Sequence, residues 1–287
     1  MSSHVFPPPP PPSGPSGPSG PAGAPAATLD VRGTSPVPFW RLCLVELRKA
    51  RDTRAGFWLM FTIGLLVTLL QLIALISVNV QDIESSFTDF TGNVFLVALI
   101  LMPILAIMLV TTEWSQRTAM VSFTLEPRRL RVVLAKLGAA VLLALLTVAL
   151  MFVVAAVCTA LCDVLQPELT DWDVEAEFVF LLAPIALVVT TVFGFALASL
   201  FLNTPASIVV FLIAWYASLA ILAAIAGFIP AFEDVIPWLS IQLNVLLLAE
   251  ELPQTAEAWG QLLVSGGVWI VAPLVLGVLR ILRAEVK

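Results

Sequence analysis

A dense set of charged residues lies in one stretch of this chain, TTEWSQRTAMVSFTLEPRRLRVVLAK at 111–136, which has almost wholly apolar sequence on both sides. The seven charged side chains in it are Glu113, Arg117, Glu126, Arg128, Arg129, Arg131 and Lys136. Glu113 and Arg117 are four residues apart, so on a helix they share one face and can pair. Two interpretations stay open. The charges fix the orientation of a membrane protein, or the stretch is a docking surface for a cytoplasmic protein.

Sequence patterns for catalysis and metal binding are missing. The single histidine, His4, lies in a Pro-rich tail, and no His, Cys, Asp and Glu set has the spacing of a metal site. The chain has no Gly-x-x-x-x-Gly-Lys-Ser/Thr loop that could hold nucleotide phosphates. Its apolar stretches contain no Ser/His pair, His-Glu-x-x-His motif or aspartyl pair. We therefore predict a non-enzymatic chain with no catalytic, cofactor-binding or metal-binding residues of its own.

The amino-acid composition indicates that these charged residues belong to a membrane protein. Of the 287 residues, 60% are hydrophobic and only 12% are charged, whereas soluble domains are about 25% charged. Six stretches have the length of about 20 apolar residues that crosses a bilayer. They are residues 56–79, 94–112, 132–161, 178–201, 205–229 and 263–282. We expect an all-α integral membrane protein, and we interpret the shorter apolar segment 235–249 as re-entrant or external.

The distribution of basic residues predicts the topology. All 14 Lys and Arg fall before the first span, between the second and third spans, or at the C-terminus. The segments 80–93, 162–177 and 230–262 contain Asp and Glu but neither Lys nor Arg. Because cytoplasmic loops carry the excess of Lys and Arg, six spans would place both termini and the loop at 113–131 in the cytoplasm. We expect a multi-pass protein of the cytoplasmic membrane.

Two further segments precede the first span. Residues 1–36 are rich in Pro and Gly and lack the pattern of a signal peptide, so we expect a disordered cytoplasmic tail. Residues 39–53, FWRLCLVELRKARDT, are amphipathic at helical spacing and predict a helix in the membrane interface. The side chains expected to hold this helix at the lipid surface are Trp40, Arg41, Arg48 and Lys49.

In this order, the segments resemble the permease subunit of type 2 ABC transporters over about residues 38–285. The resemblance combines the amphipathic helix, the loop after span two, a tight turn near Asn203 and a long external segment before span six. The loop residues that match the family pattern are Glu113, Thr118, Leu125, Pro127, Arg129, Ala135 and Lys136. Arg117 stands where the family usually has Gly, which leaves the shape of the turn there open.

The resemblance implies an ATP-driven exporter whose domain 37–287 pairs with a second permease, in a homodimer or a heterodimer. A separate ABC ATPase subunit would bind ATP and Mg²⁺, and no nucleic acid is involved. The residues expected to couple this chain to the ATPase are Glu113, Trp114, Arg117 and Thr118. The basic side chains expected at the membrane boundary are Arg128, Arg129, Arg131 and Lys136.

Polar residues in or beside the apolar stretches are candidates for a substrate path, because such groups usually face protein or water. They are Gln71, Asn79, Asn93, Thr190, Thr191, Trp215 and Tyr216. The cores of the spans contain no Lys, Arg, Asp or Glu, which argues against a proton- or ion-coupled carrier. A hydrophobic or amphipathic substrate fits better. The alternative is a non-transporting membrane scaffold or regulatory protein that binds cytoplasmic partners through residues 113–131.

Overall fold

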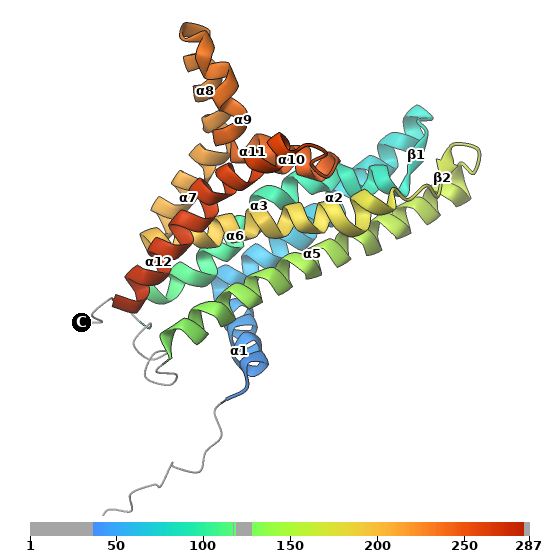
Figure 1. Ribbon diagram of the computed structural model, residues 1–287. Helices are drawn as coiled ribbons and strands as arrows, with labels where there is room; N and C mark the ends of the chain where they lie inside the picture. The colour runs from blue at the N-terminus through green and yellow to red at the C-terminus, as the bar shows by residue number, and fades with distance from the viewer. Residues whose placement is uncertain (1–36, 117, 119–127, 284–287) are drawn as a thin grey trace, which may run out of the picture. The chain divides into compact units, whose positions relative to one another are not determined.

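The structure is a computed structural model that describes residues 37–116, 118 and 128–283. The expected tail at 1–36, Arg117 and most of the loop between the second and third spans lie outside the described residues. Within them, six helical segments are long and apolar enough to cross a membrane. They are α2 (Arg54–Gln81), α3 (Phe87–Ser115), α5 (Arg129–Leu165), η1 with α6 (Phe178–Leu182, Ala183–Phe201), α7 with η2 and α8 (Thr204–Leu212, Ile213–Ala217, Ser218–Phe228), and α11 with η4 and α12 (Ala256–Gly266, Gly267–Val271, Ala272–Arg283). This confirms the prediction of a multi-pass, all-α membrane protein (Figure 1).

The helix boundaries follow ordinary capping chemistry. Ser86 and Asp89 form a reciprocal capping box at the start of α3, and Thr53 accepts a hydrogen bond from the Gly56 amide at the start of α2. At the turn between α6 and α7, Leu202 adopts a left-handed conformation with φ 52°, and the Asn203 side chain caps α7. This turn is as short as the sequence predicts. Helix α5 has 37 residues, which makes it longer than a membrane span requires.

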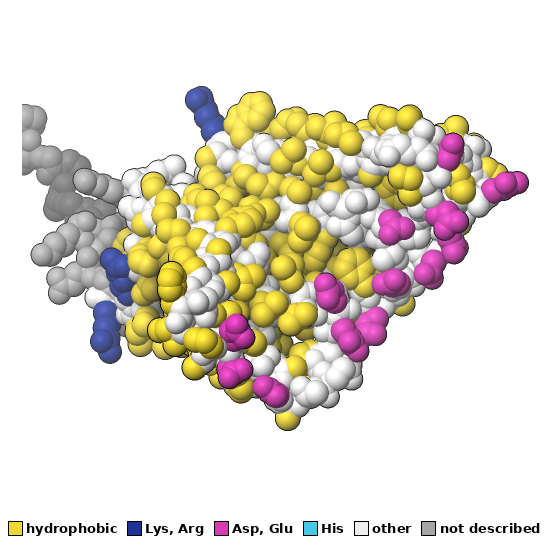
Figure 2. Space-filling model, turned by 90° about the horizontal axis from the view of Figure 1, so that it is seen from above, with side chains coloured by type: hydrophobic (Ala, Val, Ile, Leu, Met, Phe, Trp, Pro, Cys, Tyr) yellow, Lys and Arg dark blue, Asp and Glu magenta, His cyan; other side chains and the backbone are white. Residues whose placement is uncertain are grey.

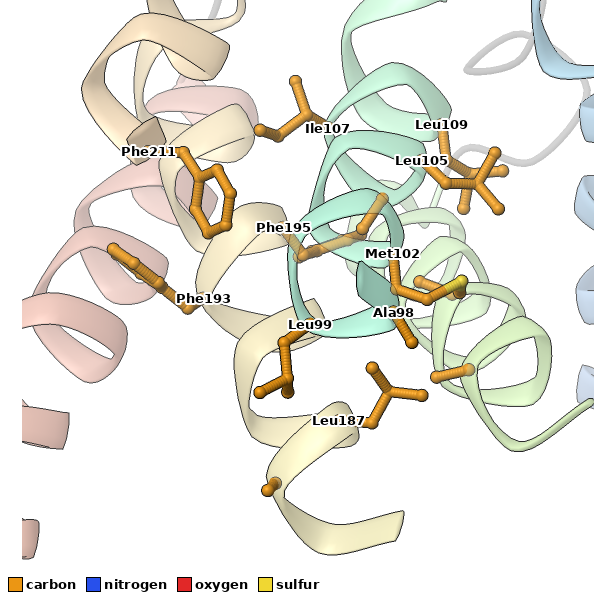
Figure 3. Close-up of a cluster of buried hydrophobic side chains, with 14 of the residues drawn as sticks. Ala98, Leu99, Met102, Leu105, Ile107, Leu109, Leu187, Phe193, Phe195 and Phe211 are labelled. Carbon is orange, nitrogen blue, oxygen red and sulfur yellow. The ribbon is translucent and has the colours of Figure 1, made fainter. Parts of the chain in front are cut away.

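Helices α3 and α6 form the centre of the bundle. Among the candidate spans they have the largest buried shares, 61% and 56%, whereas the α11–α12 segment has only 11%. Figure 3 shows large side chains such as Phe195 of α6 and Leu99 of α3 in the core around these helices. The backbones approach closely at Gly194, where an added Cβ would lie 2.6 Å from the carbonyl oxygen of Pro103. The outer helices α2, α7 and α12 expose long apolar faces, as lipid-facing helices do.

The connections at one end of the bundle are short and acidic. The two-residue strands β1 (Ser85–Ser86) and β2 (Thr170–Asp171) pair in parallel there, with Ser85 opposite Thr170.

Before the last span, η3 and α9 (Pro230–Val235, Ile236–Leu239) meet α10 (Ile241–Glu250) at a bend of 63°. This is the segment expected to be re-entrant or external. By length and composition it is a broken span or a re-entrant loop, and as a span it would be the seventh.

Charge divides the bundle into two ends. Exposed acidic residues lie in the α2–α3 and α5–α6 connections, at Asp82, Glu84, Asp89, Glu168, Asp171, Asp173, Glu175 and Glu177. Exposed basic residues lie on α1 (Phe39–Asp52), at the start of α2 and α5, and at the end of α12. Figure 2 shows the dark blue basic side chains toward one end of the visible face and magenta acidic side chains toward the other and along the lower edge. We call these the basic end and the acidic end.

Candidate functional site

At the basic end, helix α1 packs one face against the start of α5. Cys43, Glu46 and Ala50 are buried on this face, and the Cys43 Sγ would lie 3.2 Å from a Cβ added at Gly138 of α5. The helix expected at 39–53 is therefore present, but part of its expected apolar stripe contacts protein. Trp40 and Leu44 of the same stripe are exposed, and the Arg41 guanidinium lies 5.3 Å from the centre of the Trp40 ring.

Four charged side chains from three helices meet beneath α1, and we call Glu46, Lys49, Glu113 and Lys136 the charge cluster. The Lys136 Nζ of α5 lies 2.6 Å from Glu46 Oε2 and 3.1 Å from Glu113 Oε1. The Lys49 Nζ lies 2.7 Å from Glu46 Oε1 and 2.9 Å from Glu113 Oε1. Each lysine thus bridges the same two carboxylates, and the cluster is neutral as a whole.

Burial sets the energetic character of the charge cluster. The side chains of Glu46, Lys136 and Glu113 are only 5%, 8% and 13% exposed, whereas that of Lys49 is 40% exposed. The Lys136 ammonium also donates to the Leu109 carbonyl at 3.3 Å. Removing several charges from water is costly, and only mutual pairing with good geometry offsets that cost. The cluster therefore depends on all its members being present together.

The Lys49 ammonium is held in its charged form. Burial disfavours that form, but hydrogen bonds to Glu46 and Glu113 outweigh this effect and raise the pKa of Lys49 above its ordinary value. Because the folded-state pKa is raised, the resulting stabilisation is complete at neutral pH. It is lost only as the pH rises past the ordinary lysine pKa of about 10.4.

A cavity of about 290 Å³ adjoins the charge cluster. All four cluster residues line it, together with apolar side chains from α1 and α3 that include Ala50, Leu105, Met108 and Leu109. This volume is at the lower end of the range for small-molecule sites, and a mostly apolar wall with a few polar groups is typical of them. Within the described residues, no group of three His, Cys, Asp or Glu could hold a metal ion.

The residues expected to couple to an ATPase occupy different environments. Glu113 belongs to the last turn of α3 rather than to a separate short helix, and its carboxylate faces Lys49 and Lys136. Trp114 is half-buried against the core, and the exposed Thr118 lines the cavity and donates its amide to the Glu113 carbonyl at 2.9 Å. Arg117 lies outside the described residues. A contact between Glu113 and a partner protein would thus compete with two internal ion pairs.

The basic residues expected at the membrane boundary also differ from one another. Arg128 is exposed at the start of α5. Arg129 donates to the carbonyls of Ile281 and Leu282 at 3.2 and 3.4 Å, and Arg131 donates to the Val37 carbonyl at 2.6 Å. Lys136 is buried in the charge cluster, where its partners are carboxylates rather than lipid phosphates. These contacts join the start of α5 to both ends of the described chain.

The polar residues expected along a substrate path do not come together. Gln71 is fully buried and donates to the Met151 carbonyl at 3.1 Å, while Asn79 donates to its own helix and to the Cys162 sulfur. Thr190 and Thr191 bond to carbonyls of their own helix, as hydroxyls in apolar helices often do. The remaining three are the exposed Asn93, the buried Trp215 and the half-exposed Tyr216. The cavity beside the charge cluster is lined by other residues.

Comparison with known proteins does not assign the chain to a family. No protein-family model matches the chain, and no curated protein matches it significantly.

Sequence reasoning missed Glu46, the acid of α1 that pairs with Lys136 of α5 and with Lys49 of its own helix. The spacing in the sequence indicated that Glu46 is buried, because it lies three residues after Cys43 and four before Ala50, on the stripe that the helix buries. An acid on an apolar stripe near a membrane surface calls for a basic partner. The sequence offered several basic residues, and only the fold selects Lys49 and Lys136.

Proposed function

We propose that this chain is the permease subunit of an ATP-driven exporter, moving a hydrophobic or amphipathic molecule across a membrane with a separate ATPase subunit. The observation that carries the proposal is the charge cluster, which ties α1 to the helices on both sides of the loop at 116–128. The order of the elements supports it further. An amphipathic helix, six candidate spans, a tight α6–α7 turn and a bent helix pair before the last span follow one another as in type 2 ABC permeases.

The mechanism follows from this connection. The loop leaves α3 just after Glu113 and enters α5 two turns before Lys136, roughly 10 Å along the helix. A subunit that pushed on the loop would move the ends of α3 and α5, and the ion pairs would make α1 move with them. A packed, ion-paired unit moves as a rigid body and does not absorb the displacement locally. In this proposal, the charge cluster transmits ATPase closure to the spans.

The proposal is tested by cross-linking at the described ends of the loop. The native cysteines Cys43, Cys158 and Cys162 are buried, so a Gln116→Cys variant supplies an accessible thiol at the basic end. In native membranes, a short bifunctional reagent at this thiol is expected to capture an ATPase that contains a phosphate-binding loop. The isolated complex should then hydrolyse ATP and transport amphipathic dyes into vesicles.

The matched control is Asp173→Cys, an exposed position at the acidic end. It should capture no ATPase under the same conditions. Purification of the intact chain without any ATPase, or with an ATPase that drives no transport, would favour the alternative of a non-transporting scaffold.

The same two variants test the proposed orientation. With intact cells, a membrane-impermeant maleimide should label Asp173→Cys and leave Gln116→Cys unlabelled until the membrane is opened. The reason is that the basic end is expected in the cytoplasm. Labelling of Gln116→Cys in intact cells, with Asp173→Cys protected, would show that the orientation in the membrane is opposite to the proposed one.

A further inference from the structure

A second hollow lies along the bundle, next to the cavity beside the charge cluster. This hollow, of about 160 Å³, lies among α2, α3 and α5 and is lined by Met60, Ile63, Gly64, Leu146 and Leu150, together with Leu105. Leu105 also lines the first cavity, so the two spaces adjoin at this side chain. Figure 3 shows Leu105 and Leu109 projecting from α3 on the side away from Phe193 and Phe211. The two hollows lie one after the other inward from the charge cluster, on either side of Leu105, and we call them together the track.

The length of the track is close to that of an extended acyl chain. Lys136 and Leu150 mark its two ends on α5, and 14 residues of helix span roughly 21 Å. Leu146 is 60% exposed and Leu150 is 36% exposed, so the inner hollow opens on the apolar outer surface of the bundle. A molecule in the track would have its polar head near the membrane surface and its chain in the hydrocarbon region.

The charges at the mouth favour an anionic head. Of the four cluster side chains, that of Lys49 is the most exposed, whereas both carboxylates are largely buried, so the cluster charge open to a ligand is the ammonium that also contacts Glu46 and Glu113. The exposed side chain of Gln116 lines the same mouth and can donate a hydrogen bond. Arg48, Arg51 and Arg54 are exposed nearby in the chain and outnumber Asp52, which makes this corner positive.

We propose that this track binds a single-chain anionic amphipath, with its carboxylate or phosphate head at Lys49 and Gln116 and its acyl chain along Leu105 toward Leu150. Charge-assisted hydrogen bonds would hold the head, and burial of methylene groups would hold the chain. The proposal concerns binding alone and does not rest on the proposed transport function, because no ATPase is needed to test it.

The test is photolabelling of the purified, detergent-solubilised protein. The probes are a fatty acid with a diazirine in its chain, the methyl ester of that acid, and a lysophosphatidic acid with the same labelled chain. Labels from the anionic probes are expected in the peptides around 105–109 and 146–150. An excess of unlabelled fatty acid should displace them. The stronger of the two anionic probes identifies the head as carboxylate or phosphate, whereas equal labelling by the methyl ester would overturn the assignment of an anionic head.

Two matched pairs of variants sharpen the test. Met108→Trp places a large ring in the first cavity and should abolish the labels, while Leu96→Trp, at an exposed position of the same helix, should not. Lys49→Gln should weaken binding of the anionic probes about tenfold, a loss typical of one hydrogen bond to a charged group, and Arg283→Gln, at the exposed end of α12, should change it little. Labels spread evenly over the apolar surface of the unaltered protein would refute the site. This outcome does not depend on whether the variants fold.

Discussion

Replacement of Lys136 by Met is expected to destabilise the folded protein by about 3–5 kcal/mol, because it leaves two largely buried carboxylates with one half-exposed ammonium between them. Lys136 contacts both Glu46 and Glu113, and its side chain is only 8% exposed. The measurement is the free energy of unfolding in mixed detergent, together with the amount of protein in the membrane. Arg48→Met is the control, because Arg48 is exposed on the same end of the bundle and should shift stability by about 0.5 kcal/mol or less.

A second substitution separates lost charge balance from lost packing. Adding Glu46→Gln to Lys136→Met removes one carboxylate along with one ammonium and leaves the Glu113–Lys49 pair at 2.9 Å. The double variant should therefore be more stable than the sum of the two single effects by at least about 1 kcal/mol, the range seen for residues in one charged network. Strict additivity would show that the four residues do not act as a unit.

The charge cluster also changes what is expected of Glu113→Arg. If Glu113 only docked a partner, this reversal would uncouple the two proteins and leave insertion intact. In the structure the new guanidinium would face both Lys49 and Lys136. Like charges at this distance repel strongly in a buried setting. We therefore expect loss of folded protein as well as loss of coupling, so exposed positions such as Gln116 report docking more cleanly.

Replacement of Gly194 by Ala is expected to separate the central helices and to destabilise the protein by about 1–3 kcal/mol, the usual cost of overpacking. The added methyl group would meet backbone atoms of Pro103 at 2.6 and 2.9 Å, and backbone atoms at the packed centre of α3 cannot move aside as a flexible side chain can. The melting temperature of the purified protein should fall, and the loss should be larger for Gly194→Leu.

Gly92 provides a control of opposite sign. It lies in helix α3, and a Cβ added there meets nothing within 4 Å. Ala has a higher helix propensity than Gly by about 1 kcal/mol, so Gly92→Ala should be neutral or stabilising. Stabilisation by Ala at both positions would mean that helix propensity, rather than the α3–α6 approach, decides the result at Gly194.

Much of the fold was predictable because local chemistry determines it. The length of the apolar stretches predicts the spans, and the observed helices Arg54–Gln81 and Arg129–Leu165 contain the expected ones with a few more residues at each end. The short turn at Asn203 was visible as a polar residue before Pro205. At the start of α3, the capping pair Ser86 and Asp89 extends the helix well before the apolar run begins. Capping, rather than hydropathy, sets that boundary.

The candidate site was less predictable because it is made of long-range pairs. Glu113 and Lys136 were both selected from the sequence, but as a docking group and a membrane anchor. Glu113 pairs with Lys49 and Lys136 pairs with Glu46, and both of these partners lie more than 60 residues away on a helix expected to face lipid. The sequence shows which side chains are charged. Which of them meet depends on how α1 lies across α5, and tertiary packing decides that.

The mutual dependence of the four charges has a consequence for recognising relatives of this protein. We expect a substitution that removes one member of the cluster to be tolerated only when an opposite charge is removed with it, so the four positions should change together over evolutionary time. A sequence pattern follows from their places in the fold. It has an acid and a lysine three residues apart on the helix before the first span, an acid in the last turn of the second span, and a lysine two turns into the third span. Such spacing can identify distant homologues after overall similarity has been lost.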